Sequence, residues 1–497
     1  MRRVDAVPSV GAPRAGFPGY SEASPLDFDG LGAAARQGMV ERLVGGTFDA
    51  WADAASRVGH CAHPIKLVGS SSRVDRATGE VTSTYSSRHE PFGVTYVRCG
   101  NRRGSVCPAC SRIYARDTFE MIRAGVVGGK SVPEQVSGNP LVFLTLTAPS
   151  FGPVHAAKGG QRCRPRDGHA VCEHSRSVAC WQAHEGDDLA VGTPICPECY
   201  DYAAHAIWQW WAPELWRRFT ITTRRVIARA MGVPDLRLGE VATLQYAKVA
   251  EYQARGVVHF HALVRLDGPK TLEGYAPAPA SITPLVLAGW LEEAAARVHF
   301  DAPPCAGHDA GRLRFGAQVD ARSVTATRGD DPHAPLVGEQ VAGYLAKYAT
   351  KAASDTTDPR RGCGHYRRLR ATIDDLADHR VAGDGYELMG KWVHMLGFRG
   401  HFSSKSRRYS ITLGALRRAR ARWQRIATDS ARDGRQMPVL DFADLIADDE
   451  EETTLVVGSW NYVGTGWDTA ADTALALAAA DRARAYDQWR AETAWRA

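Results

Sequence analysis

Two strand-like segments joined by a short turn constrain the fold of this chain most strongly. The segments "EVATLQYAKVAEYQ" (240–253) and "VVHFHALVRL" (257–266) are rich in β-branched and aromatic residues, and only Ala254, Arg255 and Gly256 separate them. A three-residue loop with glycine at a position that tolerates positive φ is typical of a β-hairpin. Residues equally distant from the loop centre face each other across a hairpin, so the loop length sets the register.

This register places a carboxylate and two imidazoles together. Glu251 lies opposite His259, and His261 leaves the same strand face because side chains alternate along a strand. Such a group can bind a divalent metal and leave coordination positions open for water and a phosphate oxygen. A His-x-His pair alone also occurs as core filler or surface decoration, and a loop one residue longer or shorter would turn Glu251 to the other face. The register therefore predicts a metal site at Glu251, His259 and His261.

The order of the expected elements indicates an α+β fold. In chain order we expect a strand at "LVFLTLTA" (141–148), a helix at 201–232, the two hairpin strands, a helix at about 283–299, a strand near 313–321, and a helix over "GYLAKYATKAA" (343–353). This order fits an antiparallel sheet with helices packed on one face, which is the split βαβ arrangement.

The segment "GYLAKYATKAA" repeats the pattern Tyr-x-x-Lys. As a helix it would present Tyr344 and Tyr348 on one face, one turn apart, with Lys347 and Lys351 close by. The alternative is an ordinary amphipathic helix whose tyrosines cover the core and whose lysines are solvated. The pattern alone leaves both interpretations open.

The chain has no stretch of 18 or more apolar residues and no apolar signal-peptide region near its start, so we expect a cytoplasmic protein without a membrane partner.

The cysteines of the chain indicate structural zinc. Its 11 cysteines, an odd number, then favour zinc over disulfides. Cys99, Cys107 and Cys110 form one cluster, and Cys61 can supply the fourth thiolate.

A second cluster lies in the segment that follows the first expected strand. Cys196 and Cys199 supply one ligand pair. The other pair comes from five candidates: Cys163, Cys172, His174, Cys180 and His184. Cys172 and Cys180 are preferred because thiolates dominate structural sites. Zinc here would hold a segment that is otherwise too long to be ordered.

A basic segment suits a polyanion. Residues 391–428 contain ten Lys or Arg and no Asp or Glu, whereas "DFADLIADDEEE" just after them contains seven acids. Its aromatic residues Phe398, Phe402, Tyr409 and Trp423 are expected to stack on bases. The candidate DNA-binding residues are Arg399, Lys405, Arg407, Arg408, Arg417 and Arg418. The alternative is a solvated basic helix.

These patterns divide the chain into five segments. They are a disordered N-terminal segment (1–35), a helical zinc-binding region (36–130), the α+β domain with its zinc-binding insertion at about 150–200 (131–355), a basic, mainly helical DNA-binding region (356–430), and an acidic linker with an Ala-rich helix (431–497).

Three motifs in this order carry a family resemblance. "FLTLT", "HFH" with the upstream Glu251, and "YLAKYATK" resemble the motifs of two-tyrosine HUH endonucleases, which start rolling-circle replication. The blocks "CGNRRGSVCPACSR", "ICPECYDY" and "LGFRGHFSSKSRRYS" further resemble the RepSA-type replication initiators of actinobacterial plasmids, over residues 60–425. The resemblance does not extend beyond about residue 430.

The resemblance implies an HUH-type DNA nickase and strand transferase. Mg²⁺ or Mn²⁺ at the histidine strand would polarise a phosphate of single-stranded origin DNA, and a tyrosine would attack it to give a 5′-phosphotyrosyl enzyme and a 3′-OH primer. Lys347 and Lys351 would assist, and their positions favour Tyr348 for the first attack. Partners would be single- and double-stranded plasmid origin DNA and the host polymerase.

The segment "AGVVGGKS" (124–131) is not expected to bind ATP, because Ala124 stands where a nucleotide-binding loop needs its first glycine. The segment before it reads as a helix, whereas such a loop follows a strand. A host helicase is therefore expected to unwind the template. Two alternative functions remain open at this point. One is a two-tyrosine transposase, and the other is a zinc-containing DNA-binding regulator without catalysis.

Overall fold

The chain forms two compact units. The computed structural model describes residues 32–166, 171–272, 274–309, 311–325, 336–349, 363–446 and 454–496. Unit 1 comprises Met1–Ala115 and Ala447–Ala497, and unit 2 comprises Arg116–Ile446. The division falls within helix α3 (Pro108–Val127). It differs from the five expected segments, because the C-terminal residues belong with the N-terminal ones.

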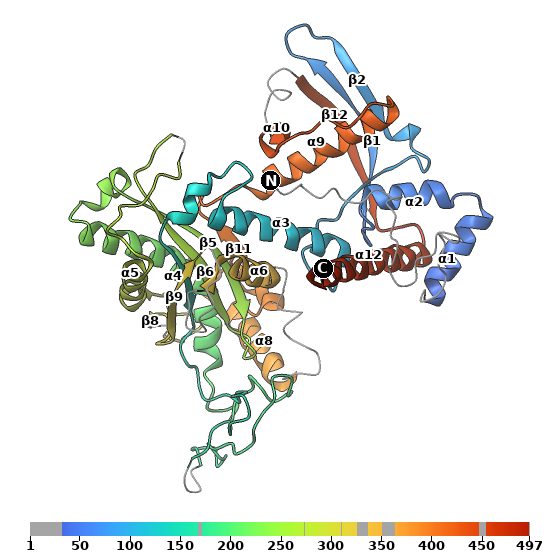
Figure 1. Cartoon of the computed structure of the whole chain (residues 1–497). Helices are drawn as coiled ribbons and strands as arrows, with labels where there is room; N and C mark the ends of the chain where they lie inside the picture. The colour runs from blue at the N-terminus through green and yellow to red at the C-terminus, as the bar shows by residue number, and fades with distance from the viewer. Residues whose placement is uncertain are drawn as a thin grey trace. The chain divides into compact units, whose positions relative to one another are not determined.

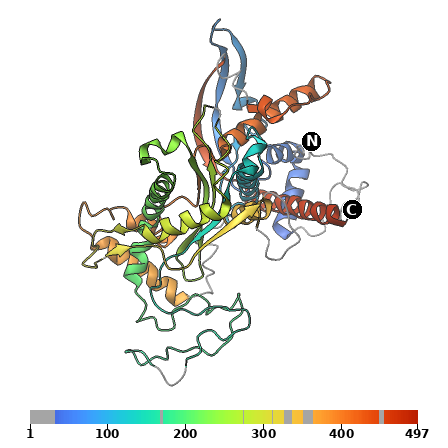
Figure 2. The ribbon, with the colours of Figure 1, turned by 60° about the vertical axis from the view of Figure 1, so that its left-hand side comes forward.

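Unit 1 is built on an antiparallel sheet in which β1 is central. β1 (Ile65–Asp75) pairs with β12 (Thr454–Thr465) along its whole length and with β2 (Val81–Ser86) and β3 (Thr95–Val97) on its other side. Figure 2 shows β1, β2 and β12 as a long, narrow ribbon. The region expected to be helical therefore contains three strands, and the expected acidic linker contains a fourth.

Helices complete unit 1. They are α1 (Ala33–Val44), α2 (Phe48–Arg57) and α12 (Ala470–Arg496), the last of which matches the expected Ala-rich helix. Arg42 of α1 donates to both carboxylate oxygens of the buried Asp472 of α12, at 2.9 and 2.8 Å. Trp51 packs against Trp467, with ring centroids 5.4 Å apart. These contacts hold the two ends of the described chain together.

Unit 2 contains a six-stranded sheet in the order β10-β9-β4-β6-β5-β11. All neighbouring strands are antiparallel except β10 and β9. Its strands are β4 (Leu141–Leu146), β5 (Thr243–Tyr252), β6 (Val258–Asp267), β9 (Val319–Thr325), β10 (Leu336–Val337) and β11 (Ser403–Lys405). The antiparallel α+β class expected from the sequence is confirmed.

Two connections through helices interleave in this sheet (Figure 1). Helix α4 (Tyr202–Ala230) joins β4 to β5, and β6 lies between those strands. Helix α5 (Pro284–Arg297) joins β6 to β9, and β4 lies between those strands. Asp201 caps α4 by accepting from the backbone N–H of Ala204 at 2.8 Å.

The sheet has helices on both faces, not on one as expected. Phe260 and Ala262 belong to the same buried cluster as the aromatic residues of α4 and the apolar residues of α5. His259 and His261 alternate with them and point to the opposite face. Helix α6 (Gly338–Ala349) covers that face beside β5, and its Tyr344 contacts His261.

Unit 2 also contains strands and helices outside the six-stranded sheet and helices α4, α5 and α6. They are β7 (Phe300–Asp301), β8 (Arg312–Leu313), α8 (Cys363–Asp378), α9 (Leu413–Arg432) and α10 (Phe442–Ile446). The connection between β4 and α4 leaves the sheet as a long loop in both views, with no helix or strand in its described residues (Figures 1 and 2). It corresponds to the expected Cys/His-rich insertion.

One lysine lies inside the apolar core of unit 2. The side chain of Lys248 shares the face of Phe260, whose ring centroid is 4.9 Å from its Nζ atom, and Lys248 is only 5% exposed. Nζ donates to the carbonyl oxygen of His401 at 2.9 Å. Burial disfavours the charged ammonium and lowers the pKa of Lys248 to about 7.

Candidate active site

The hairpin has the register predicted from its loop. Glu251 of β5 pairs with His259 of β6, and the loop Ala254–Gly256 is closed by a hydrogen bond from the Gln253 N–H to the Val257 carbonyl oxygen at 2.8 Å. Gly256 has a backbone φ of +83°, which residues other than glycine rarely adopt. Loop length and glycine position therefore decide which side chains share the face of His259.

The three predicted metal ligands converge on one point. The ligand atoms of Glu251, His259 and His261 all lie within 4.8 Å of one another. The Nε2 atoms of both imidazoles are 3.2 Å from the same carboxylate oxygen, Glu251 Oε2. The three side chains are only 5–16% exposed. This group can hold a metal ion.

The protonation of the group suits metal binding. Burial acts to raise the pKa of Glu251, but hydrogen bonds with His259 and His261 outweigh it and lower that pKa to about 2. Burial lowers the pKa of His261 below its usual value. A carboxylate and a neutral imidazole are the forms that ligate metals.

Strand β4 holds one of the histidines in place. Thr145 pairs with His261 in the register of β4 and β6, and its Oγ1 atom lies 3.0 Å from His261 Nδ1. Phe143 stacks on the same imidazole, with centroids 5.5 Å apart and an interplanar angle of 8°. The segment "FLTLT" therefore fixes the ring from two sides. Sequence reasoning used this segment only as a motif and missed the contact.

Tyr344 of α6 reaches the ligand group. Its hydroxyl lies 3.3 Å from His261 Nε2 and donates to Glu251 Oε2 at 3.4 Å. Its ring packs edge-on against His261 and Phe143. Among the α6 residues whose side chains are described, Val341, Ala342, Leu345 and Ala346 are buried, whereas Tyr344 is 38% exposed. The interpretation of Tyr344 as a core residue is therefore wrong.

The other members of the Tyr-x-x-Lys repeat lie outside the described part of the chain. Lys347 and Tyr348 are in α6, but only their backbone is described, and Lys351 follows the last described residue of the helix. Their roles stay predictions.

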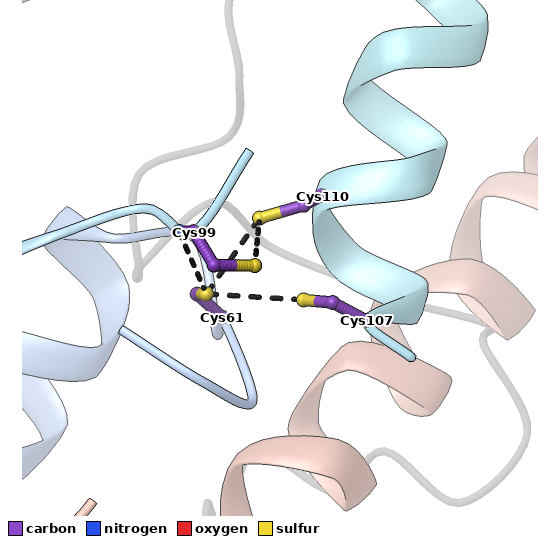
Figure 3. A group of neighbouring side chains, drawn as sticks. All are labelled: Cys61, Cys99, Cys107 and Cys110. Atoms are coloured by element: carbon purple, nitrogen blue, oxygen red, sulfur yellow. Dashed lines mark hydrogen bonds between the residues drawn. The ribbon is translucent and has the colours of Figure 1, made fainter. Parts of the chain in front are cut away.

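Four cysteines of unit 1 come together as expected (Figure 3). Cys61, Cys99, Cys107 and Cys110 form one group that can hold a metal. The Sγ atom of Cys61 is 3.8 Å from that of Cys107 and 3.6 Å from that of Cys110, and Cys99 Sγ is 3.7 Å from Cys110 Sγ. Cys107 directly precedes α3 and Cys110 lies in its first turn, so the start of this helix brings both thiols together.

The second expected cluster is corrected at one position. Cys172, Cys196 and Cys199 come together, but their fourth member is His174, not Cys180. His174 Nδ1 lies 3.3 Å from Cys199 Sγ. Cys180 belongs to a separate group with His155, Cys163 and His184. Cys163, His174 and His184 were among the open alternatives, whereas nothing in the local pattern pointed to His155.

The basic segment divides into engaged and exposed residues. The Arg399 guanidinium lies over the ring of Trp210, 4.3 Å from its centroid, and that of Arg408 donates to the Thr271 carbonyl oxygen. Lys405 donates to the Ser410 carbonyl oxygen at 2.7 Å, and burial lowers its pKa to about 8. The side chains of Arg407, Arg417 and Arg418 are exposed. The DNA-binding role of all six stays a prediction.

Three of the aromatic residues of this segment are buried, whereas Trp423 is half-buried and its stacking role stays a prediction. Phe398, Phe402 and Tyr409 are at most 6% exposed. Phe398 and Phe402 belong to the main core, and Tyr409 donates to the carbonyl oxygen of Ile122. The expectation that these three rings stack on bases is therefore wrong.

Among the described helices, none has the length and apolar character that a membrane span requires.

Comparison with known proteins identifies the family. Residues 47–481 match the RepSA family, described as "Replication initiator protein, pSAM2". A replication initiator protein from Streptomyces ambofaciens is 39% identical over 431 residues, which cover 84% of this chain and 86% of the relative. No solved structure gives a significant match. The chain belongs to the RepSA family of plasmid replication initiator proteins.

Proposed function

We propose that this replication initiator is a metal-dependent nickase and strand transferase that cuts one strand of plasmid origin DNA and stays attached to it through Tyr344. The observation that carries the proposal is the position of the Tyr344 hydroxyl, 3.3 Å from His261 Nε2 and 3.4 Å from Glu251 Oε2. A nucleophile beside a candidate metal centre is the arrangement that cleavage of a phosphodiester requires.

The fold supports an HUH-type endonuclease core. The interleaved connections through α4 and α5 support the proposed split βαβ arrangement. His259 and His261 lie on a central strand of the sheet, and the tyrosine helix α6 covers the same face. Membership of a replication initiator family favours this reading over the transposase.

The ligand set fits Mg²⁺ or Mn²⁺. One carboxylate and two imidazoles leave coordination positions for water and a phosphate oxygen. When bound, either ion would supply Lewis-acid polarisation of the scissile phosphate. Glu251, His259 and His261 would hold it, and Thr145 would orient His261.

Tyr344 would perform the chemical step. Its phenolic oxygen forms a bond to phosphorus, the bond from phosphorus to the 3′ oxygen breaks, and the phenolic proton is lost as the 3′ oxygen gains one. Because a free tyrosine has a pKa of about 10, only about 0.1% is ionised at pH 7, a handicap of about 4 kcal/mol. We propose that Lys347 and Lys351 offset part of it by favouring negative charge on the tyrosine and the phosphate.

Tyr348 would serve as the second nucleophile. It follows Tyr344 by one helical turn, about 6 Å along the axis. After one round of synthesis the regenerated origin must be cut again, and a second hydroxyl on the same helix would do so. The order proposed here, Tyr344 first, reverses the preference drawn from the lysine positions.

Other parts of the chain would serve DNA binding and stability. We propose that the exposed Arg407, Arg417 and Arg418 contact phosphates of single- and double-stranded origin DNA. Zn²⁺ would stabilise the group of four cysteines in unit 1 and the group of Cys172, His174, Cys196 and Cys199.

Host proteins would complete the replication. The 3′-OH product would prime the host polymerase. The segment "AGVVGGKS" spans the end of helix α3 and does not follow a strand as a nucleotide-binding loop does. We therefore propose that a host helicase, and not this segment, supplies the ATP-driven unwinding of the template.

The test is a search for covalent protein–DNA adducts. Purified protein is incubated with Mn²⁺ and single-stranded fragments of its own plasmid origin, and the denatured products are mapped by peptide mass spectrometry. We expect an adduct at Tyr344 that Tyr344→Phe removes and that Tyr462→Phe, a control at an exposed tyrosine of unit 1, retains. Sequence-specific binding without any adduct would instead support the non-catalytic regulator.

A further inference from the structure

We propose that the insertion between β4 and α4 binds a further structural zinc ion through His155, Cys163, Cys180 and His184. The ligand atoms of these four residues lie within 4.8 Å of one another, separately from the group that contains Cys172. Two thiolates and two imidazoles form a ligand set typical of closed, structural zinc sites. The insertion would then hold two zinc ions, not one.

The four ligand atoms point at one another inside the protein. His184 Nε2 lies 3.1 Å from His155 Nδ1 and 3.3 Å from Cys180 Sγ. Cys163, His184 and Cys180 are 0, 2 and 8% exposed. The insertion has no helix or strand in its described residues and so has few apolar contacts to bury such groups. A shared ion explains why they converge.

A carboxylate fixes the orientation of one ligand. His184 Nδ1 lies 2.5 Å from Asp188 Oδ2, and the other oxygen of Asp188 accepts from the backbone N–H of Ala190 at 2.8 Å. The Nδ1 atom is thereby occupied and Nε2 faces the other ligands. A histidine held by a carboxylate in this way is a common partner arrangement around zinc.

The two groups of the insertion alternate along the chain. The ligand pairs follow in the order 155 and 163, 172 and 174, 180 and 184, 196 and 199; the first and third pairs form the proposed site, and the second and fourth form the other group. Each ion would therefore close a loop that contains a ligand pair of the other ion. Removing one ion should loosen the second site as well.

The proposed site holds the base of the insertion against the hairpin. The N–H of His155 donates to the Thr193 carbonyl oxygen, and the N–H of Gly192 donates to the His155 carbonyl oxygen, both at 2.9 Å. A Cβ atom at Gly192 would lie 2.3 Å from the carbonyl carbon of Ala254 in the hairpin loop. Only glycine allows this approach, because Gly192 also has φ of +88°.

The test is the number of zinc ions per chain. Native mass spectrometry and elemental analysis of the purified full-length protein should give three in the wild type. His184→Ala and Cys163→Ser should each give fewer, and the control His299→Ala, at an exposed histidine outside the groups, should keep three. Two zinc ions in the wild type, or three in both ligand variants, would overturn the proposal.

A milder change tests the site in a folded protein. Asp188→Asn should keep three zinc ions, and one of them should pass to a chelator about 10–100-fold faster than in the wild type. Chelator release that is unchanged for all three ions would overturn the proposal. Both measurements are independent of nicking, so their outcome does not depend on the proposed catalytic function.

Discussion

Replacing Thr145 by valine should weaken metal binding at the proposed catalytic centre. Thr145 Oγ1 lies 3.0 Å from His261 Nδ1, and valine has nearly the same shape but cannot form this hydrogen bond. The imidazole would lose a partner that sets its orientation and tautomer. Loss of such a partner costs about 10–100-fold in metal affinity or activity, which corresponds to about 1.4–2.7 kcal/mol.

The assay follows nicking of a single-stranded origin oligonucleotide as the Mn²⁺ concentration is raised. We expect the half-saturating Mn²⁺ concentration of Thr145→Val to rise about 10–100-fold, while the rate at saturating metal approaches that of the wild type. Thr147→Val is the matched control, because the Thr147 hydroxyl donates to the Gln318 carbonyl oxygen at 2.6 Å and contacts no ligand.

The two variants separate a role at the metal from a role in stability. Each should lose about 1 kcal/mol of unfolding free energy with its hydrogen bond, but only Thr145→Val should change the metal dependence. A Thr145→Val protein with the wild-type half-saturating concentration would refute the assigned positioning role.

Four further predictions follow from the same structure. His259→Ala should abolish nicking and leave duplex binding, measured by electrophoretic shift, largely intact. Burial lowers the folded-state pKa of Lys248 to about 7, so the unfolded state binds more protons above pH 7. The unfolding free energy of the wild type, measured by chemical unfolding, should therefore rise by up to about 1.4 kcal/mol per pH unit towards pH 9. Lys248→Met should remove this rise. Arg417→Gln should weaken DNA binding and reduce its salt slope by about one, whereas Arg399→Gln, which removes the stacking on tryptophan, should lower the melting temperature. Cys107→Ser should release one zinc ion and lower the melting temperature of unit 1; a chain with unchanged zinc content and stability would contradict the assignment.

The hairpin shows what the sequence could predict. A loop of three residues and strict alternation along two strands are local rules, so the pairing of Glu251 with His259 followed from counting. The position of Tyr344 against His261 was not predictable in this way. It depends on how a helix more than 80 residues later packs on the sheet, and the motif order alone indicated it.

The cysteines and unit 1 show where local rules end. Which residues act as ligands in the insertion depends on which loops meet. The sequence spacing of the cysteines and histidines therefore predicts neither the participation of His155 nor the exchange of Cys180 for His174. β12 was hidden because its partner strand lies at the other end of the chain. The buried Phe398 and Tyr409 were misassigned because aromatic residues among arginines suit base stacking and core packing equally well.

The pairing of β1 with β12 has a consequence for the order in which the chain folds during synthesis. Asp75 pairs with Thr454, about 380 residues later, and at about 5–20 residues per second the ribosome needs roughly 20–80 s to make that distance. Unit 2 is complete in sequence before β12 exists, so it can fold while one edge of β1 still awaits its partner. Among the strands that the structure describes, the first to emerge is thus completed by the last one. An interrupted translation product exposes an unpaired strand edge that can be recognised as incomplete or aggregate.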